Sequence, residues 1–172
     1  MFEPDLEYLK ELFERSARHR GHFLERACFV ERLIEDIIAY DFFPKPTQNK
    51  NRMMMLSFIF NEPSLTFRIK TSILNNLLTN RHKSILKSHP NLIRRLDEIR
   101  KLRNHLSHLT LDSSEEFLSQ KLEDTLQYFK YEKGREKKYV YKVSEIDKCI
   151  KDCEAIISEL NKVREEIQKD IK

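Results

Sequence analysis

Glycine and tryptophan are almost missing from this chain: Gly21 and Gly134 are the only glycines in 172 residues, and tryptophan does not occur. Loops that bind nucleotide phosphates need several closely spaced glycines, because side chains would keep the backbone away from the ligand. No such loop can be written here, and we expect no cofactor. Prolines are also few, whereas Leu, Ile, Glu and Lys, which mostly favour helices, are abundant.

Disulfides and membrane spans are not expected either. The cysteines number three, and Cys149 and Cys153 lie four residues apart, a spacing that places both on one helix face. No apolar run approaches the roughly 20 residues that cross a bilayer. The N-terminal residues are too acidic for a signal peptide. We therefore expect a cytoplasmic protein with no membrane contact, folded as a single domain over residues 1–172.

Apolar residues recur at three- and four-residue spacing over most of the chain, which predicts helices. A proline-containing loop is expected at 42–52. The apolar segment 53–60 is either a buried helix or a strand, and we favour the helix, with Met53–Met55 as core residues that fill gaps. The remaining helices are expected at about 4–13, in a longer segment ending at Phe42, from about Pro63, at 91–108 and at 112–129.

The C-terminal third of the chain carries two other patterns. Tyrosines and lysines alternate on both sides of Gly134, which predicts a β-hairpin near residues 128–143. From Ser144 onward, apolar residues alternate four and three apart, a heptad seam that packs either within the chain, the commoner case, or against a partner. Together these patterns predict an all-α helical bundle with a small β-hairpin insert and a long C-terminal helix.

Positive charge is concentrated rather than evenly spread. The net charge is only +4, but eight cations occur between Arg81 and Arg103, opposed there by Asp97 and Glu98 alone. Clustered Lys and Arg suit a polyanion, because they meet phosphates and release counterions. An ordinary solvated helix face explains the same charge pattern equally well.

Within the expected helix 91–108, Arg103 projects into the arc formed by the leucines. A buried guanidinium is costly unless it is paired. Arg103 is therefore expected either to hold an anion in a cleft or to pair with an acid on an earlier helix. His108, five residues later, lies on another face of an ideal helix. The two could converge on one phosphate if the helix frays near His108 or if two copies form the cleft. The candidate acids are Glu31, Glu35 and Asp36.

The sequence RNHLSH, residues 103–108, resembles the R-N-x-x-x-H signature of the HEPN superfamily, the higher-eukaryote and prokaryote nucleotide-binding domains. The order of helices over roughly residues 15–130 is similar to that family's compact helical bundle, in which the signature lies on a late helix. The resemblance implies a homodimer that cleaves RNA without a metal ion.

The family's activity assigns a role to each motif residue. Arg103 and His108 from both copies would surround the scissile phosphate, with His108 as acid or base and Asn104 in support. The 2′-hydroxyl of the RNA would attack, leaving a 2′,3′-cyclic phosphate. Further RNA contacts are expected from Arg94, Arg100, Lys101 and His105.

The same resemblance leaves a second interpretation open. Many HEPN members are regulators or scaffolds without catalysis, and proteins similar to the mannitol operon repressor have a related helical design. In that case Arg103 and His108 would be structural. In the catalytic case the protein could be a toxin or defence factor, with a protein antitoxin or regulatory partner. Some family toxins carry a tyrosine two residues after the histidine, which a partner modifies, but here Thr110 occupies that position.

Other residues suggest weaker alternatives. The pairs His19/His22 and His105/His108 could each supply two metal ligands, but no spacing supplies a third, so we expect no metal site. The hairpin tyrosines could stack on bases, although a half-buried hairpin explains them equally well.

Overall fold

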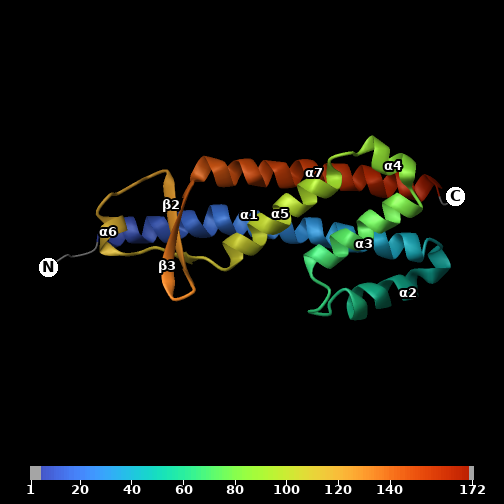
Figure 1. Ribbon diagram of the computed structural model, residues 1–172, viewed down its shortest axis with the longest axis horizontal. Coiled ribbons are helices and arrows are strands. Elements are labelled where there is room, and N and C mark those ends of the chain that lie inside the picture. The colour runs from blue at the N-terminus through green and yellow to red at the C-terminus, as the bar shows by residue number, and fades with distance from the viewer. Residues whose placement is uncertain (1–4, 171–172) are drawn as a thin grey trace. The chain divides into compact units, whose positions relative to one another are not determined.

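The computed structural model describes residues 5–170, and helices dominate it (Figure 1). This confirms the predicted mainly helical class with a small hairpin and a long C-terminal helix. Along the chain the elements are α1 (Leu6–Phe42), the 3₁₀ turn η1 (Pro46–Gln48), α2 (Asn49–Met54), the π-helical turn η2 (Met55–Ile59), α3 (Phe67–Asn80), α4 (Lys83–Ser88), α5 (Leu92–Ser107), β1 (Thr110–Leu111), α6 (Glu115–Leu118), β2 (Thr125–Glu132), β3 (Arg135–Lys142) and α7 (Val143–Asp170).

Contacts within the chain divide it into two compact units. The hairpin unit comprises the described residues up to Arg26 together with Leu102–Asp152. The helical unit comprises Ala27–Lys101 together with residues 153–170. Helices α1, α5 and α7 contribute residues to both units, whereas all three strands belong to the hairpin unit. Among the described residues, no helix is both long and apolar enough to cross a bilayer.

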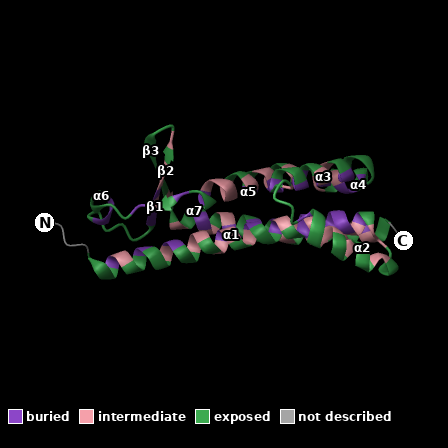
Figure 2. Cartoon of the chain, turned by 90° about the horizontal axis from the view of Figure 1, so that it is seen from below, coloured by how far each residue is buried: buried purple, intermediate pink, exposed green. Residues whose placement is uncertain are grey.

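Helix α1 is continuous, so the predicted boundary between a first helix near residues 4–13 and a second, longer one is wrong. That boundary was expected because residues 14–22 contain no large apolar side chain. Ser16 within this segment is nevertheless buried, as are Leu12 and Phe23 on either side of it, and Figure 2 shows buried positions recurring along α1. Packing therefore offsets the cost of about 1 kcal/mol for Gly21 inside a helix. Pro4 lies outside the described residues.

The helix predicted at 112–129 is also wrong. Only the four-residue α6 forms, and Lys121 then adopts a positive φ of 45°. The Asp112 carboxylate accepts hydrogen bonds from the Ser114 N–H (2.9 Å) and from the Gln127 side chain (2.6 Å). These bonds fix a turn before α6 and connect it to β2, so the strand begins at Thr125 rather than near 128.

The hairpin itself is confirmed and forms part of a three-stranded antiparallel sheet in the order β1-β2-β3. Its two-residue turn has Lys133 and Gly134 at φ of 52° and 75°, the backbone of a tight hairpin turn. The register places Tyr128 opposite Tyr139. We call the sheet face that carries these two tyrosines the inner face. On it, the Tyr128 and Ser16 hydroxyls are hydrogen bonded (3.1 Å), which joins β2 to α1.

The helical unit has a core of aliphatic side chains and a buried ionic cluster. The heptad seam of α7 is buried within the chain from Cys153 to Ile167, whereas Cys149 is partly exposed. Helix α3 begins close to the start predicted near Pro63, and the apolar Ile69 on it is exposed. The buried face carries Lys70 instead, held by acids of α1. The buried residues of α3 are Phe67, Lys70, Thr71, Leu74, Leu77 and Leu78.

Segment 42–60 forms more helix and less core than predicted. The expected loop holds η1 and the start of α2, and the expected buried helix contains exposed Met53 and Met54. Arg52 fastens α2 to the end of α1: its guanidinium donates to the Phe43 carbonyl (2.9 Å) and lies over the Tyr40 ring. The assignment of Met53 and Met54 to the core is therefore wrong.

Candidate nucleic-acid site

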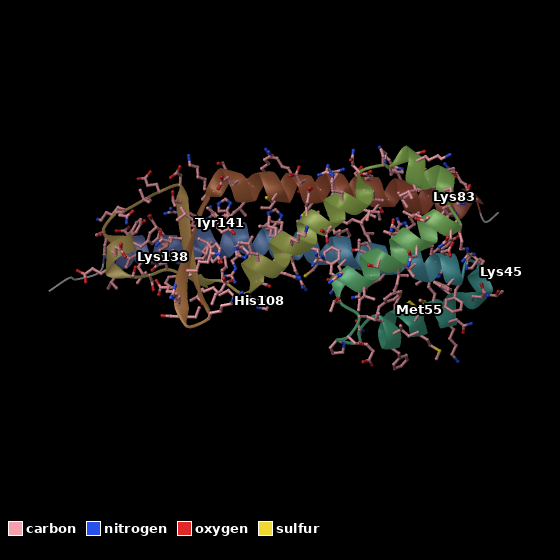
Figure 3. All side chains as sticks on the ribbon, viewed as in Figure 1. Lys45, Met55, Lys83, His108, Lys138 and Tyr141 are labelled. Carbon is pink, nitrogen blue, oxygen red and sulfur yellow. The ribbon has the colours of Figure 1, made fainter. Side chains whose placement is uncertain are left out.

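The R-N-x-x-x-H residues lie where α5 ends. Arg103, Asn104 and His105 belong to its last turns, and His108 is in the turn that follows Ser107, which confirms the predicted helix to within one residue at each end. The His108 N–H donates to the His105 carbonyl (3.2 Å), a tight closing turn. Because His108 lies beyond the last helical residue, its direction is not fixed by helical geometry. Its side chain is exposed, and Figure 3 labels it at the end of α5.

Arg103 is partly buried and is bonded within the motif. Its guanidinium donates to the side-chain oxygen of Asn104 (3.0 Å), so these two residues form one polar pair. The Ser107 hydroxyl donates to the Asn104 carbonyl (3.1 Å) and helps to close the last helical turn. Asn104 thereby holds the arginine.

The acids proposed as partners of Arg103 have other interactions in the helical unit. Glu31 and Glu35 both accept hydrogen bonds from the Lys70 ammonium, at 2.7 and 2.5 Å. Burial raises the pKa of Asp36, although the positive charges of Arg164 and Arg52 oppose the rise. Pairing of Arg103 with one of these acids stays a prediction.

The other cations predicted to bind RNA are paired along α5 itself. Arg94 bonds to Glu98, while Arg100 and Lys101 both bond to Asp97, at 2.6 and 2.7 Å. These hydrogen bonds lower the pKa of Asp97. All three cations belong to the helical unit, whereas the motif residues 103–108 belong to the hairpin unit. Only His105, of the four, is in the same compact unit as Arg103 and His108.

His105 packs on the inner face of the hairpin. Its ring meets Tyr139 edge to face, with the ring centroids 4.4 Å apart. Burial lowers the pKa of His105, and the nearby charges of Lys130 and Lys137 lower it further, with Glu132 opposing them. His105 is therefore a neutral packing residue near pH 7, which suits a nucleobase contact better than a phosphate contact.

The hairpin brings basic side chains to the same face. Residues 125–142 contain six cations and two carboxylates. Lys130 lies opposite Lys137, and both share the inner face with Tyr139. Glu132 lies within 3.4 Å of Lys130 and 3.9 Å of Lys137 and offsets part of their charge. The alternation of tyrosine and lysine predicted the hairpin, but it did not indicate that His105 would pack on it.

Arg20 of α1 is a further cation of this site that sequence reasoning missed. Its guanidinium lies over the Tyr128 ring (5.4 Å to the centroid) and donates to the Ser107 carbonyl (3.5 Å). It therefore approaches the end of α5 next to His108. The available signal was the dense run of cations at residues 15–20.

A pocket of about 470 Å³ lies between the hairpin and the start of α7. Its walls are mixed, with Leu102, Leu106 and Tyr141 on one side and Glu145, Lys148 and Cys149 on the other. Burial and the neighbouring carboxylate of Asp152 raise the pKa of the Cys149 thiol, which therefore stays protonated at neutral pH and is a poor nucleophile. Within the described part of the chain, no group of three or more His, Cys, Asp or Glu residues is placed to hold a metal ion.

The helical unit contains a second cluster that the sequence did not indicate. His82 is buried, with its Nε2 2.7 Å from Asp41 and its Nδ1 3.3 Å from Asp170. Arg81 also bonds to the buried Asp41 carboxylate. This cluster joins α1, the start of α4 and α7, and its members bond to one another.

No family model, no curated protein and no solved structure matches the chain.

Proposed function

We propose that the protein is a HEPN-type endoribonuclease that cleaves RNA without a metal ion, as a homodimer, in a toxin or defence role. The observation that carries the proposal is the exposed His108 directly after α5, in the same compact unit as the Arg103–Asn104 pair. The type of reaction is inferred from the likeness of residues 103–108 to the family signature. The basic inner face of the hairpin supports a polyanionic substrate.

The chemistry suits these residue types. His108 accepts the proton of an RNA 2′-hydroxyl, whose oxygen then attacks the adjacent phosphorus. The bond from phosphorus to the 5′-oxygen breaks, and that oxygen takes up a proton from a second imidazole, the same residue of the other copy. Arg103 stabilises the charge that grows on the phosphoryl oxygens. The products are a 2′,3′-cyclic phosphate and a 5′-hydroxyl.

The test is cleavage of a mixed-sequence RNA by the purified protein in EDTA. We expect the wild type to cut and to leave cyclic phosphate ends. His108→Ala is the decisive variant, because an exposed side chain can be removed without disturbing the fold, and it should abolish cleavage. The double variant Arg103→Ala/His108→Ala should be equally inactive. His22→Ala is the matched control, since the His22 ring accepts a hydrogen bond from Arg26 of its own helix and lies outside the motif, and it should keep full activity.

Two outcomes would count against the proposed ribonuclease. Cleavage that survives in His108→Ala contradicts the proposal and points to a contaminant or to another site. A folded dimer that cuts none of several RNAs favours a non-catalytic HEPN-like regulator, similar to the mannitol operon repressor. That second function is favoured by one observation: Arg94, Arg100 and Lys101 are already paired with acids of their own helix.

A further inference from the structure

An apolar groove of about 380 Å³ opens on the surface of the helical unit. Phe42 and Phe43, at the end of α1, line one part of it, and α2 and η2 line the rest. Phe58, Met53 and Phe42 expose 70, 57 and 53% of their surfaces. An exposed apolar patch of this kind marks a binding surface in a folded protein. The residues that line the groove are Phe42, Phe43, Asn51, Met54, Met55, Phe58 and Ile59.

The groove is held open by specific contacts. Arg52 bonds to the Phe43 carbonyl and stacks on Tyr40, which fixes α2 against the end of α1. In the π-helical turn the Phe60 N–H donates to the Met55 carbonyl (3.1 Å), five residues back. Phe60 is buried, whereas Phe58 is exposed, so the widened turn sends one aromatic ring inward and the other outward. Such turns are often found at functional sites.

The segment that lines most of the groove is basic. No acidic residue occurs between Asp41 and Glu62, whereas this stretch contains Lys45, Lys50 and Arg52. Asp41 itself is buried and bonded to Arg81. Lys50 is exposed and lies one turn before Met54 on α2, so it shares that residue's side of the helix. Figure 3 shows Lys45 and Met55 on the same segment.

We propose that this groove binds an amphipathic helix with an acidic border, supplied by a partner protein. A concave apolar surface accepts the apolar side chains that project from one face of such a helix, and flexible methionines adapt to their shape. Glu and Asp beside that face would pair with Lys45 and Lys50. The groove should therefore bind an acidic helix more tightly than a basic one.

Charge and shape argue against the other occupants of this groove. Two copies of the chain related by a twofold axis would bring the same lysines together, and like charges would repel. A bilayer surface would not fill a concavity. The groove belongs to the helical unit, whereas the R-N-x-x-x-H residues 103–108 belong to the hairpin unit. This inference therefore does not depend on ribonuclease activity.

The experiment uses the full chain and two synthetic helical peptides of about 18 residues, long enough to form a helix. Both carry Leu at positions i, i+3, i+4 and i+7. One has Glu at the bordering positions and the other has Lys. Fluorescence anisotropy of labelled peptide should show at least tenfold tighter binding of the Glu peptide. Phe58→Asp should weaken that binding at least tenfold, and Lys45→Glu/Lys50→Glu should reverse the preference between the peptides.

Phe13→Asp is the matched control, because Phe13 is also an exposed aromatic residue on a helix but lies outside the groove. It should bind the Glu peptide as the wild type does. Phe58→Asp should keep the wild-type circular dichroism spectrum and melting temperature, since the ring is exposed. Equal binding of the two peptides, or undiminished binding by Phe58→Asp, overturns the proposal. So does an absence of peptide binding together with Phe58-dependent self-association, or with Phe58-dependent binding to phosphatidylserine vesicles.

Discussion

Lys70 is a buried cation whose removal should destabilise the fold strongly. Its ammonium lies between the carboxylates of Glu31 and Glu35, with 7% of the side chain exposed. Replacing Lys70 with Met leaves two carboxylates close together, partly buried and without their cation. Breaking a buried ion pair from one side costs about 3 kcal/mol, and we expect a loss of that size in urea unfolding.

A control and a rescue variant make this prediction specific. Lys83→Met removes an exposed lysine from α4 and should change stability by less than about 0.5 kcal/mol. Adding Glu31→Gln and Glu35→Gln to Lys70→Met should recover part of the loss, because the remaining charges are then gone. If Lys70→Met is as stable as Lys83→Met, the cluster contributes nothing to the fold.

His105 should make stability depend on pH in the acidic range. Burial, with the charges of Lys130 and Lys137, lowers the pKa of this imidazole in the folded state. Below about pH 6.5, the ordinary value, the unfolded chain therefore binds a proton that the folded chain binds less readily. Stability should fall as the pH drops through this range and be unaffected above it.

The measurement is urea unfolding at pH 7.5 and pH 5, with His105→Phe beside the wild type. The wild type should lose more stability than the variant between the two pH values, because the variant has no imidazole at this position. The other five histidines are common to both proteins and cancel in the comparison. Equal losses would show that His105 titrates as it does in the unfolded chain.

At the scale of the elements, the two glycines should respond to alanine in opposite ways. Gly134 has a φ of 75° in the hairpin turn, where an L side chain is strained, and Gly134→Ala should destabilise the protein by about 1 kcal/mol. Gly21 lies inside α1, and Gly21→Ala should stabilise it by about 1 kcal/mol. Apart from the adjacent backbone, no described atom lies within 4 Å of the added Cβ at either site. Backbone conformation alone therefore decides the sign of the stability change. Thermal unfolding of both variants measures the signs, and equal signs would contradict the prediction.

The elements that the sequence predicted correctly have strong local signals. Helix α5 and helix α7 follow continuous apolar periodicity, and the hairpin follows its alternation and Gly134. The elements that the sequence predicted wrongly depend on contacts between residues far apart in the chain. Helix α1 continues because packing outweighs a polar, glycine-containing stretch, and β1 forms because Thr110 and Leu111 pair with a strand that follows them in the chain.

The candidate site was predictable only in part. The motif fixes residues 103–108 on one helix end, and that placement follows from the sequence. The packing of His105 on Tyr139 and the approach of Arg20 require the tertiary fold. The apolar groove was missed because a run of Met, Phe and Ile is usually core, and nothing in the local pattern indicates that Met53 and Phe58 stay exposed.

At the scale of the whole molecule, the proposed function requires two copies. The proposed mechanism uses the His108 imidazoles of both copies, one as base and the other as acid, so a dimer that lacks either imidazole should not cleave RNA. Wild-type protein and His108→Ala, refolded together, should form mixed dimers that do not cleave, whereas wild-type protein refolded alone should cleave.

Mixed dimers can be verified independently of activity by tagging the wild type and the variant differently and purifying through both tags. Doubly tagged dimers that cleave RNA would show that one His108 is sufficient and would contradict the mechanism with two imidazoles. Monomers at micromolar concentration, by analytical ultracentrifugation, would contradict the composite site.

The tyrosines that build the inner face also determine how this protein emits light. Without tryptophan, its near-ultraviolet fluorescence comes from six tyrosines, and Tyr40 is the one that belongs to the helical unit. Burial raises the pKa of Tyr128 and of Tyr141, so both rings stay un-ionised into alkaline solution. In a Tyr40→Phe variant, emission would report the hairpin unit alone. Opening of that unit could then be followed optically without an attached dye, while circular dichroism follows the helices of both units.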